Sequence, residues 1–292
     1  MTTFSAARRK NTPTAPEEAS MRKTAWISTL VCLAVLCAAP FATAGKLDDI
    51  KARGALVAGV KDSQPPFGYV DEKSNQIVGF EIDLMEALAK RLGVKLELKP
   101  VTSSTRIPML GQGAVDIVAA TMTHKKERED QVDFSITYFM TGQKLLVKKG
   151  GGVNSAADLA GKKVASVKGS TSEQNVKKAQ PGCTVISFET YPEAFLALKQ
   201  GKVQAMTTDE SILVGIKNSD DNPDAWEIVG DYISPEPYGL GLPENDSDFR
   251  DFVNLALMNM WETGEYQKIY EKWFGKGKKD YLPLTWKMEL WP

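Results

Sequence analysis

Short apolar runs alternate with amphipathic segments along most of the chain beyond residue 45. Residues 55–60 and 183–188 are rich in β-branched and apolar side chains, and residues 94–101 alternate apolar and polar positions with a period of two. Both patterns are typical of β-strands. Residues 80–93 instead repeat apolar side chains every three or four positions and stop at Gly93, which predicts an amphipathic helix.

The same alternation continues through the middle of the chain. Further strands are predicted at 114–121, 162–169 and 203–208, with helices at 106–113 and starting near Ser172, Tyr191 and Glu210. Strands that alternate with helices predict an α/β fold with mainly parallel sheets. Ligands of such folds bind at the carboxyl ends of the strands, so loops that follow strands are the first places to look for a site.

The last third of the chain has a different pattern. Residues 247–275 form two amphipathic segments that are separated at Gly264, and they are rich in aromatic side chains. We expect these aromatics to pack against an earlier element rather than to hold a cofactor. They are Trp261, Tyr266, Tyr270, Trp273 and Phe274.

The N-terminal segment has the three parts of a secretory signal peptide. Arg22 and Lys23 precede an apolar run at 25–39, and small residues end the segment at Ala44. The run is too short to span a membrane. Residues 1–44 are therefore expected to be a signal peptide with an N-terminal extension, with Met1 or Met21 as the start. Cleavage near Ala44 would release the mature protein into the periplasm.

Composition narrows the function classes. The chain has 292 residues and a formal net charge of −1, which argues against a nucleic-acid partner. It has a single histidine, His124, and no Cys-x-x-Cys pair, so no metal site is expected. Only Cys183 follows the signal peptide, which leaves no internal disulfide. No cofactor is expected.

Several motifs occur in a specific order: GVKDSQPPFGY, GFEIDLMEALAKRLG, DIVAATMTHKKERED, VDFSITYF, KGSTSE, YPEAFLALKQGKVQAMTTDE and EKWFG. In this order the chain, from about residue 47 to 275, resembles the extracytoplasmic solute-binding proteins of polar amino acid ABC importers, family 3. The segments TSSTRIP and DAWEIVGDYISPEPYGLGL resemble the glutamate/aspartate-binding subgroup most. The resemblance implies a two-lobe periplasmic-binding-protein fold of type II with two hinge crossovers. Lobe 1 would comprise 45–139 and 236–292, and lobe 2 would comprise 140–235.

An α-amino acid presents one carboxylate and one ammonium, so its binder needs a forked cation, hydroxyl donors and one carboxylate. The resemblance assigns the α-carboxylate to Arg128 and Thr123, with Thr121 lending backbone contacts. Thr171 would donate to the same carboxylate from the second lobe, and Asp209 would take the ammonium. From the local sequence alone, Arg128 is one charge in an exposed mixed run, and the hydroxyls near Thr171 are helix caps.

The remaining positions concern the ligand side chain. Family members for neutral or basic amino acids place two aromatics where this chain has Gln64 and Ser103. Arg106 and Lys61 are the extra cations here, and with Arg128 they suit the two carboxylates of glutamate or aspartate. Lysine cannot fork as arginine does, and Tyr191 stands where glutamate/aspartate binders can carry histidine. Glutamine or asparagine therefore stays an alternative.

The resemblance predicts a non-enzymatic binder that captures glutamate or aspartate between its lobes and delivers it to a membrane permease with its ATPase subunits. We expect the mature protein to be a monomer. The alternative from another class is an exported dehydratase on the same fold, which would use a carboxylate in the cleft as a general acid or base. Product formation would distinguish the enzyme from the binder.

Overall fold

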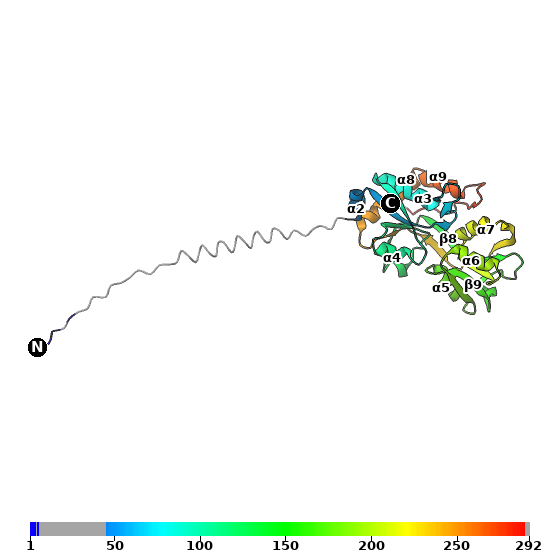
Figure 1. Ribbon diagram of the computed structural model, residues 1–292, viewed down its shortest axis with the longest axis horizontal. Coiled ribbons are helices and arrows are strands. Elements are labelled where there is room, and N and C mark those ends of the chain that lie inside the picture. Colours follow the sequence, from blue (N-terminus) through cyan, green and yellow to red (C-terminus); the bar gives the residue numbers. More distant parts are fainter. Residues whose placement is uncertain (4, 6–44, 290–292) are drawn as a thin grey trace. The chain divides into compact units, whose positions relative to one another are not determined.

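The computed structural model describes residues 1–3, 5 and 45–289. The predicted signal peptide lies almost wholly outside the described residues. Between residues 45 and 289 the chain forms two lobes, each built on its own β-sheet with helices around it (Figure 1). No helix in the described part of the chain is long and apolar enough to cross a membrane. The expected two-lobe α/β fold is confirmed.

The first lobe contains a five-stranded sheet. Its strands are, in spatial order, β5 (Lys95–Pro100), β1 (Ala55–Val60), β6 (Ile117–Ala119), β14 (Gly241–Leu242) and β7 (Asp133–Phe134). A small sheet of β2 (Ser63–Gln64), β3 (Gly68–Asp71) and β4 (Gln76–Val78) adjoins it. The helices of this lobe are α2 (Lys46–Arg53), α3 (Phe80–Leu92), α4 (Arg106–Gly111), α8 (Ser247–Glu262) and α9 (Glu265–Phe274).

The second lobe contains a six-stranded sheet. Its strand order is β10 (Thr184–Phe188), β9 (Lys163–Val167), β11 (Ala205–Asp209), β8 (Phe139–Lys148) and β12 (Trp226–Val229), and β13 (Pro235–Tyr238) also pairs with β8. Helices α5 (Thr171–Ala179), α6 (Tyr191–Lys199) and α7 (Glu210–Ser219) pack on it. Single 3-10 turns lie at η1 (Lys126–Arg128), η2 (Ala156–Leu159) and η3 (Pro223–Ala225).

The alternation of strands and helices suggested mainly parallel sheets, but the main sheet of each lobe is mixed. Strands β5, β1 and β6 are parallel, as are β10, β9 and β11, and these are the strands that the sequence predicted. The remaining pairs are antiparallel: β14 pairs in this way with β6 and β7, and β8 with β11 and β12. The physical reason is connectivity, because parallel neighbours need a crossover of a dozen or more residues, whereas β8 and β14 enter their sheets as part of the passage between lobes.

The passage between the lobes is a pair of antiparallel strands. β8 and β13 pair from Phe139 opposite Tyr238 to Gly142 opposite Pro235. The lobe boundaries predicted from the sequence, at 139/140 and 235/236, fall within this ladder. The exact residues at which the lobes part stay a prediction.

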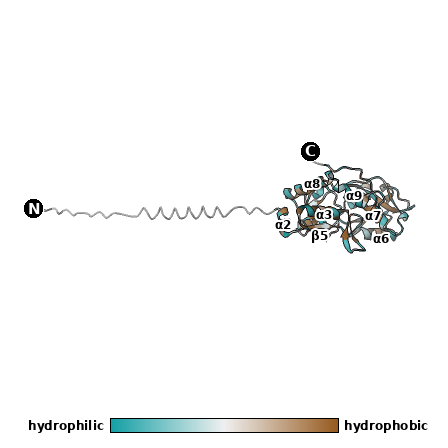
Figure 2. Cartoon of the chain, turned by 90° about the horizontal axis from the view of Figure 1, so that it is seen from above, coloured by the Kyte–Doolittle hydropathy of each residue, from teal (hydrophilic) through white to brown (hydrophobic). Residues whose placement is uncertain are grey.

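The aromatic side chains of the last two helices pack as expected. Tyr266, Tyr270 and Phe274 are buried on α9, and the rings of Tyr266 and Phe274 lie 5.8 Å and 5.4 Å from the ring of Phe80 on α3. Phe274 also contacts Phe139 at the start of β8. The outer helices carry hydrophilic and hydrophobic residues together, as their amphipathic patterns require (Figure 2).

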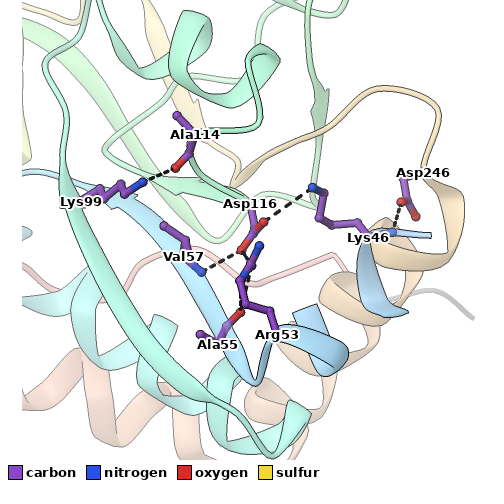
Figure 3. Close-up of polar contacts among 8 residues, drawn as sticks. All are labelled: Lys46, Arg53, Ala55, Val57, Lys99, Ala114, Asp116 and Asp246. Carbon is purple, nitrogen blue, oxygen red and sulfur yellow. Dashed lines mark hydrogen bonds and ion pairs between the residues drawn. The ribbon is translucent and has the colours of Figure 1, made fainter. Parts of the chain in front are cut away.

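A buried carboxylate fixes the amino end of the first sheet. Asp116 precedes β6 and is 1% exposed; its Oδ2 accepts from the Val57 backbone N–H at 2.8 Å and contacts Arg53 of α2. Lys46 adds an ion pair at 3.6 Å, and its backbone N–H donates to Asp246 before α8 at 2.7 Å (Figure 3). This cluster stabilises the amino end of the sheet, and its residues are separate from those at the carboxyl ends of the strands.

Candidate functional site

The residues that the sequence proposed for binding gather at the carboxyl ends of strands from both sheets. In the first lobe they follow β1, β5 and β6, and in the second they follow β9 and β10 or end β11. All are buried, at 2–9% exposure. They are Lys61, Ser103, Arg106, Thr121, Thr123, Arg128, Thr171, Tyr191 and Asp209.

Arg128 is buried within an otherwise exposed, charged run. It ends η1, where Nη1 donates to the carbonyl of Thr123 at 2.7 Å, and Nη2 reaches across to the carbonyl of Gly169 in the second lobe at 3.0 Å. Burial, and then the positive charge of Arg106, lower the pKa of Arg128 to about 9. An anionic partner would offset this cost, which makes Arg128 suited to a carboxylate.

Asp209 is the complementary group. It ends β11 at the start of α7 and is 4% exposed, and its Oδ2 accepts from the hydroxyl of Tyr238. Its Oδ1 has no hydrogen-bond partner. Burial, and then the charge of Glu236, raise the pKa of Asp209 to about 7. A buried carboxylate with a free oxygen is suited to an ammonium.

Three threonines lie between these two groups. Thr121 follows β6 with a φ of 46°, and its backbone N–H donates to Glu81 Oε1 at 2.6 Å. The hydroxyls of Thr123 and Thr171 both donate to Glu236 Oε2, at 2.5 Å and 2.8 Å. A hydroxyl has one proton. In this arrangement the two hydroxyls offer only lone pairs to other groups, which differs from their expected role as donors to a ligand carboxylate.

The groups expected to meet the ligand side chain are equally buried. Lys61 is 5% exposed and its Nζ donates to Ser103 Oγ at 3.0 Å, while Arg106 Nη1 donates to the carbonyls of Ala120 and Thr121. Burial, and next the charge of Arg106, lower the pKa of Lys61 well below its usual value. Burial likewise lowers the pKa of Arg106, whose Nε has no partner.

Tyr191 begins α6 and is 6% exposed, so it is buried as the other proposed residues are. Its phenol oxygen accepts from the hydroxyl of Thr208 at 3.1 Å. Burial, and then the charge of Asp209, raise the pKa of Tyr191 to about 12. A neutral phenol therefore stands at the position where the glutamate/aspartate subgroup can carry histidine.

Two buried carboxyl groups were missed by sequence reasoning. Glu81 opens α3 at 0% exposure, where its Oε2 has no partner and it acts electrostatically on Lys61 and Arg106. Glu236 lies in β13 at 1% exposure. Their local signals were those of a solvated first-turn charge and of a proline-flanked surface turn.

The lobes touch along the cleft at two glycines of the second lobe. A Cβ on Gly169 would lie 2.6 Å from the carbonyl oxygen of Ser103, and one on Gly215 of α7 would lie 2.0 Å from that of Pro65. Real Cβ contacts are never this short. The backbones of the two lobes therefore approach closely at these two points.

The sequence is similar to known proteins over most of its length. Residues 56–276 match the model of bacterial extracellular solute-binding proteins, family 3. A glutamine-binding protein of an ABC transporter from Bacillus subtilis (strain 168) is 42% identical over 228 residues, covering 77% of this chain and 82% of that protein. A glutamate/aspartate import solute-binding protein from Salmonella typhimurium is 35% identical over 244 residues, covering 80% of each.

Solved structures give the same picture. An ancestral arginine-binding protein bound to glutamine is 46% identical with a TM-score of 0.73, covering 77% of this chain and 99% of that one. An ancestral amino acid-binding protein described as a precursor of cyclohexadienyl dehydratase is 39% identical with a TM-score of 0.72, covering 79% of this chain and all of that one.

Proposed function

The chain belongs to the bacterial extracellular solute-binding proteins of family 3 and is a solute-binding protein of an amino acid ABC importer; from this premise we propose that it binds L-glutamine. One observation carries this choice. Six buried charged side chains, three basic and three acidic, act electrostatically on one another, and their formal charges cancel. They are Lys61, Arg106, Arg128, Glu81, Asp209 and Glu236. Glutamine is also neutral overall, whereas glutamate would bring one unbalanced negative charge into a desolvated site.

In the proposed complex, Arg128 forks onto the α-carboxylate and Asp209 takes the ammonium. The free oxygen of Asp209 and the orientation of the Arg128 guanidinium across the cleft support these roles. The carboxylate and the ammonium of the ligand would then each exchange hydrogen bonds with water for charge-assisted hydrogen bonds with a buried protein group.

The side-chain amide of glutamine suits the other end of the cleft. An amide donates and accepts hydrogen bonds, so its oxygen would accept one from Lys61 or Arg106 while its nitrogen donates to an acceptor such as Ser103. A cationic side chain such as arginine would face the like charges of Lys61 and Arg106. The relative described as glutamine-binding, at 42% identity, supports the same choice.

L-Glutamate is the second candidate, because one observation favours it. Burial raises the pKa of Glu81. A protonated Glu81 would leave Lys61 and Arg106 free for a second ligand carboxylate. Glutamate binding would then take up a proton, which glutamine binding would not.

We propose that the protein is not an enzyme. The family relatives are transport proteins by name, and Asp209 is already committed to the ligand ammonium in the proposed complex. The similarity to a precursor of cyclohexadienyl dehydratase makes a dehydratase the alternative to test. In that enzyme Asp209 would be the general acid. Turnover of a cyclohexadienyl substrate by the purified protein would overturn our assignment.

The remaining proposals concern delivery. We propose that signal-peptide cleavage near Ala44 leaves a monomer outside the cytoplasmic membrane, which closes by bending near the β8–β13 ladder. The closed form would dock on the permease, whose ATPase subunits power import. Family membership supports the extracytoplasmic location and the permease as partner.

A thermal-shift screen of the mature protein against the twenty amino acids tests the proposed ligand. A ligand at a hundred times its Kd adds about 2.7 kcal/mol to the free energy of unfolding. We expect L-glutamine to give the largest rise in Tm, L-glutamate a smaller one and arginine none. No rise in Tm with any amino acid would contradict the proposed function. A larger rise with glutamate than with glutamine would mean that the ligand is the acidic amino acid.

Lys61→Met should separate glutamate from glutamine. Without this buried ammonium, the side-chain carboxylate of glutamate has no cationic partner, whereas the side-chain amide of glutamine loses one hydrogen bond. The affinity for glutamate should therefore fall about tenfold more than the affinity for glutamine. Calorimetric titration of both ligands measures this, with Lys73→Met in the exposed turn after β3 as the control. Equal losses of affinity for the two ligands would mean that Lys61 does not distinguish their side chains.

A further inference from the structure

Glu236 is a buried carboxylate that accepts hydrogen bonds from both lobes. Its Oε2 accepts from Thr123 of the first lobe at 2.5 Å and from Thr171, at the start of α5 in the second lobe, at 2.8 Å. Its Oε1 accepts from Asn175, also on α5, at 3.1 Å and from Ser234 at 2.5 Å. Four donors thus converge on one side chain in the strand that links the lobes.

This arrangement is stronger than four separate neutral contacts. Hydrogen bonds to an ionised acceptor are roughly twice as strong as neutral ones, and here they are shielded from water, since Glu236 is 1% exposed. Thr171 is the first residue of α5, and its hydroxyl donates to Glu236 rather than to a group of its own helix.

We propose that Glu236 is a positioning residue that latches Thr123 to Thr171 and so stabilises the closed arrangement of the lobes through protein atoms alone. Opening the cleft separates Thr123 from Thr171, so at least one of the two hydrogen bonds to Oε2 must break. The latch therefore raises the closed fraction before any amino acid binds and lowers the cost of closure when one does.

The latch has a second consequence, which rests on the proposed function. Because Glu236 accepts the hydrogen bonds of both hydroxyls, Thr123 and Thr171 offer only lone pairs to a ligand, which suits the proposed ammonium. The charge of Glu236 is also, after burial, the main cause of the raised pKa of Asp209. The other charged or titratable groups that face Asp209 are Tyr238, Arg106, Arg128 and Tyr191.

The first experiment needs no ligand. Spin labels at Leu255 on α8 and Leu196 on α6, which are 56% and 51% exposed, report the distance between the lobes after Cys183→Ser removes the native thiol. We expect a closed population in the wild type. In Glu236→Gln the ratio of closed to open molecules should fall about tenfold. Glu244→Gln, at an exposed glutamate, is the control.

Thr171 gives a matched pair that leaves Glu236 in place. Thr171→Val keeps the shape but removes the donor, and should lower the closed fraction, whereas Thr171→Ser keeps the hydroxyl and should preserve it. A wild type with no closed population, an unchanged distribution in Glu236→Gln and Thr171→Val, or equal effects of valine and serine would each overturn the latch.

The pH dependence of glutamine affinity distinguishes an electrostatic role of Glu236 from a packing role. Glutamine affinity should weaken as the pH falls through about 7, where Asp209 of the free protein takes up a proton. Glu236→Gln should move this midpoint to lower pH by about half a unit or more, because a neighbouring negative charge is lost. An unmoved midpoint would contradict the electrostatic part of the proposal. If the wild type binds no amino acid, the proposed function fails, while the distance measurement still decides the latch.

Discussion

Arg128→Ala is expected to weaken amino acid binding by about 3 kcal/mol or more, which is over a hundredfold in Kd. Arg128 is the buried, forked cation that reaches both lobes, and its removal would leave the ligand α-carboxylate desolvated without a partner. Lysine at this position should recover only part of the loss, because an ammonium cannot donate two parallel hydrogen bonds from one plane.

Calorimetric titration with L-glutamine measures this effect. Lys126→Ala is the matched control, since it removes a positive charge from the same 3-10 turn but at an exposed position. Arg128→Ala also removes the interlobe contact to Gly169, so the free energy of unfolding without ligand should be measured alongside. If Arg128→Ala binds L-glutamine with near wild-type affinity, Arg128 does not bind the ligand.

Asp209→Asn is expected to weaken glutamine binding by about 2–4 kcal/mol, because the ligand ammonium loses its buried counter-ion. The pH dependence gives a sharper signature. Asp209 has a pKa of about 7 in the free protein, so below pH 7 it must lose a proton before it pairs with an ammonium. Wild-type affinity should thus rise with pH up to about 7 and level off above it, at up to tenfold per pH unit.

The asparagine variant cannot titrate, so its affinity should be flat over the same pH window. Glu210→Gln is the neighbouring control, because Glu210 pairs with Lys144 at 2.9 Å on the far side of the β11–α7 turn and should not change binding. A variant that keeps the wild-type pH profile would show that another group controls it, and the ammonium would need a different partner.

Much of the fold followed from local pattern. The strands at β1, β5, β9 and β10 and the helices α3, α8 and α9 were predicted within a few residues, because each buries one face or one run of apolar side chains and so repeats with a clear period. Strand β8 and helix α2 are among the elements that the local pattern did not predict. α2 buries only Ile50, and β8 was read as a hinge because its place is fixed by pairing partners distant in the sequence.

The candidate site divides in the same way. The order of motifs identified the family and named Arg128 and Asp209, although nothing local separates Arg128 from its exposed neighbours. Its guanidinium donates to the carbonyl of Gly169, 41 residues away, which only the folded chain brings near. Lys61 was expected to meet the ligand side chain, and the fold buries it to 5% exposure with its Nζ donating to Ser103 Oγ.

The balance of charge was decided by tertiary structure alone. From sequence, three cations suggested an acidic ligand, because Glu81 and Glu236 had the signals of solvated surface residues. Folding buries both carboxyl groups beside those cations, which shifts the expectation toward glutamine. Periodicity along the chain reports which face of an element is buried. Which charges share a desolvated space depends on contacts between distant segments, and no local pattern records them.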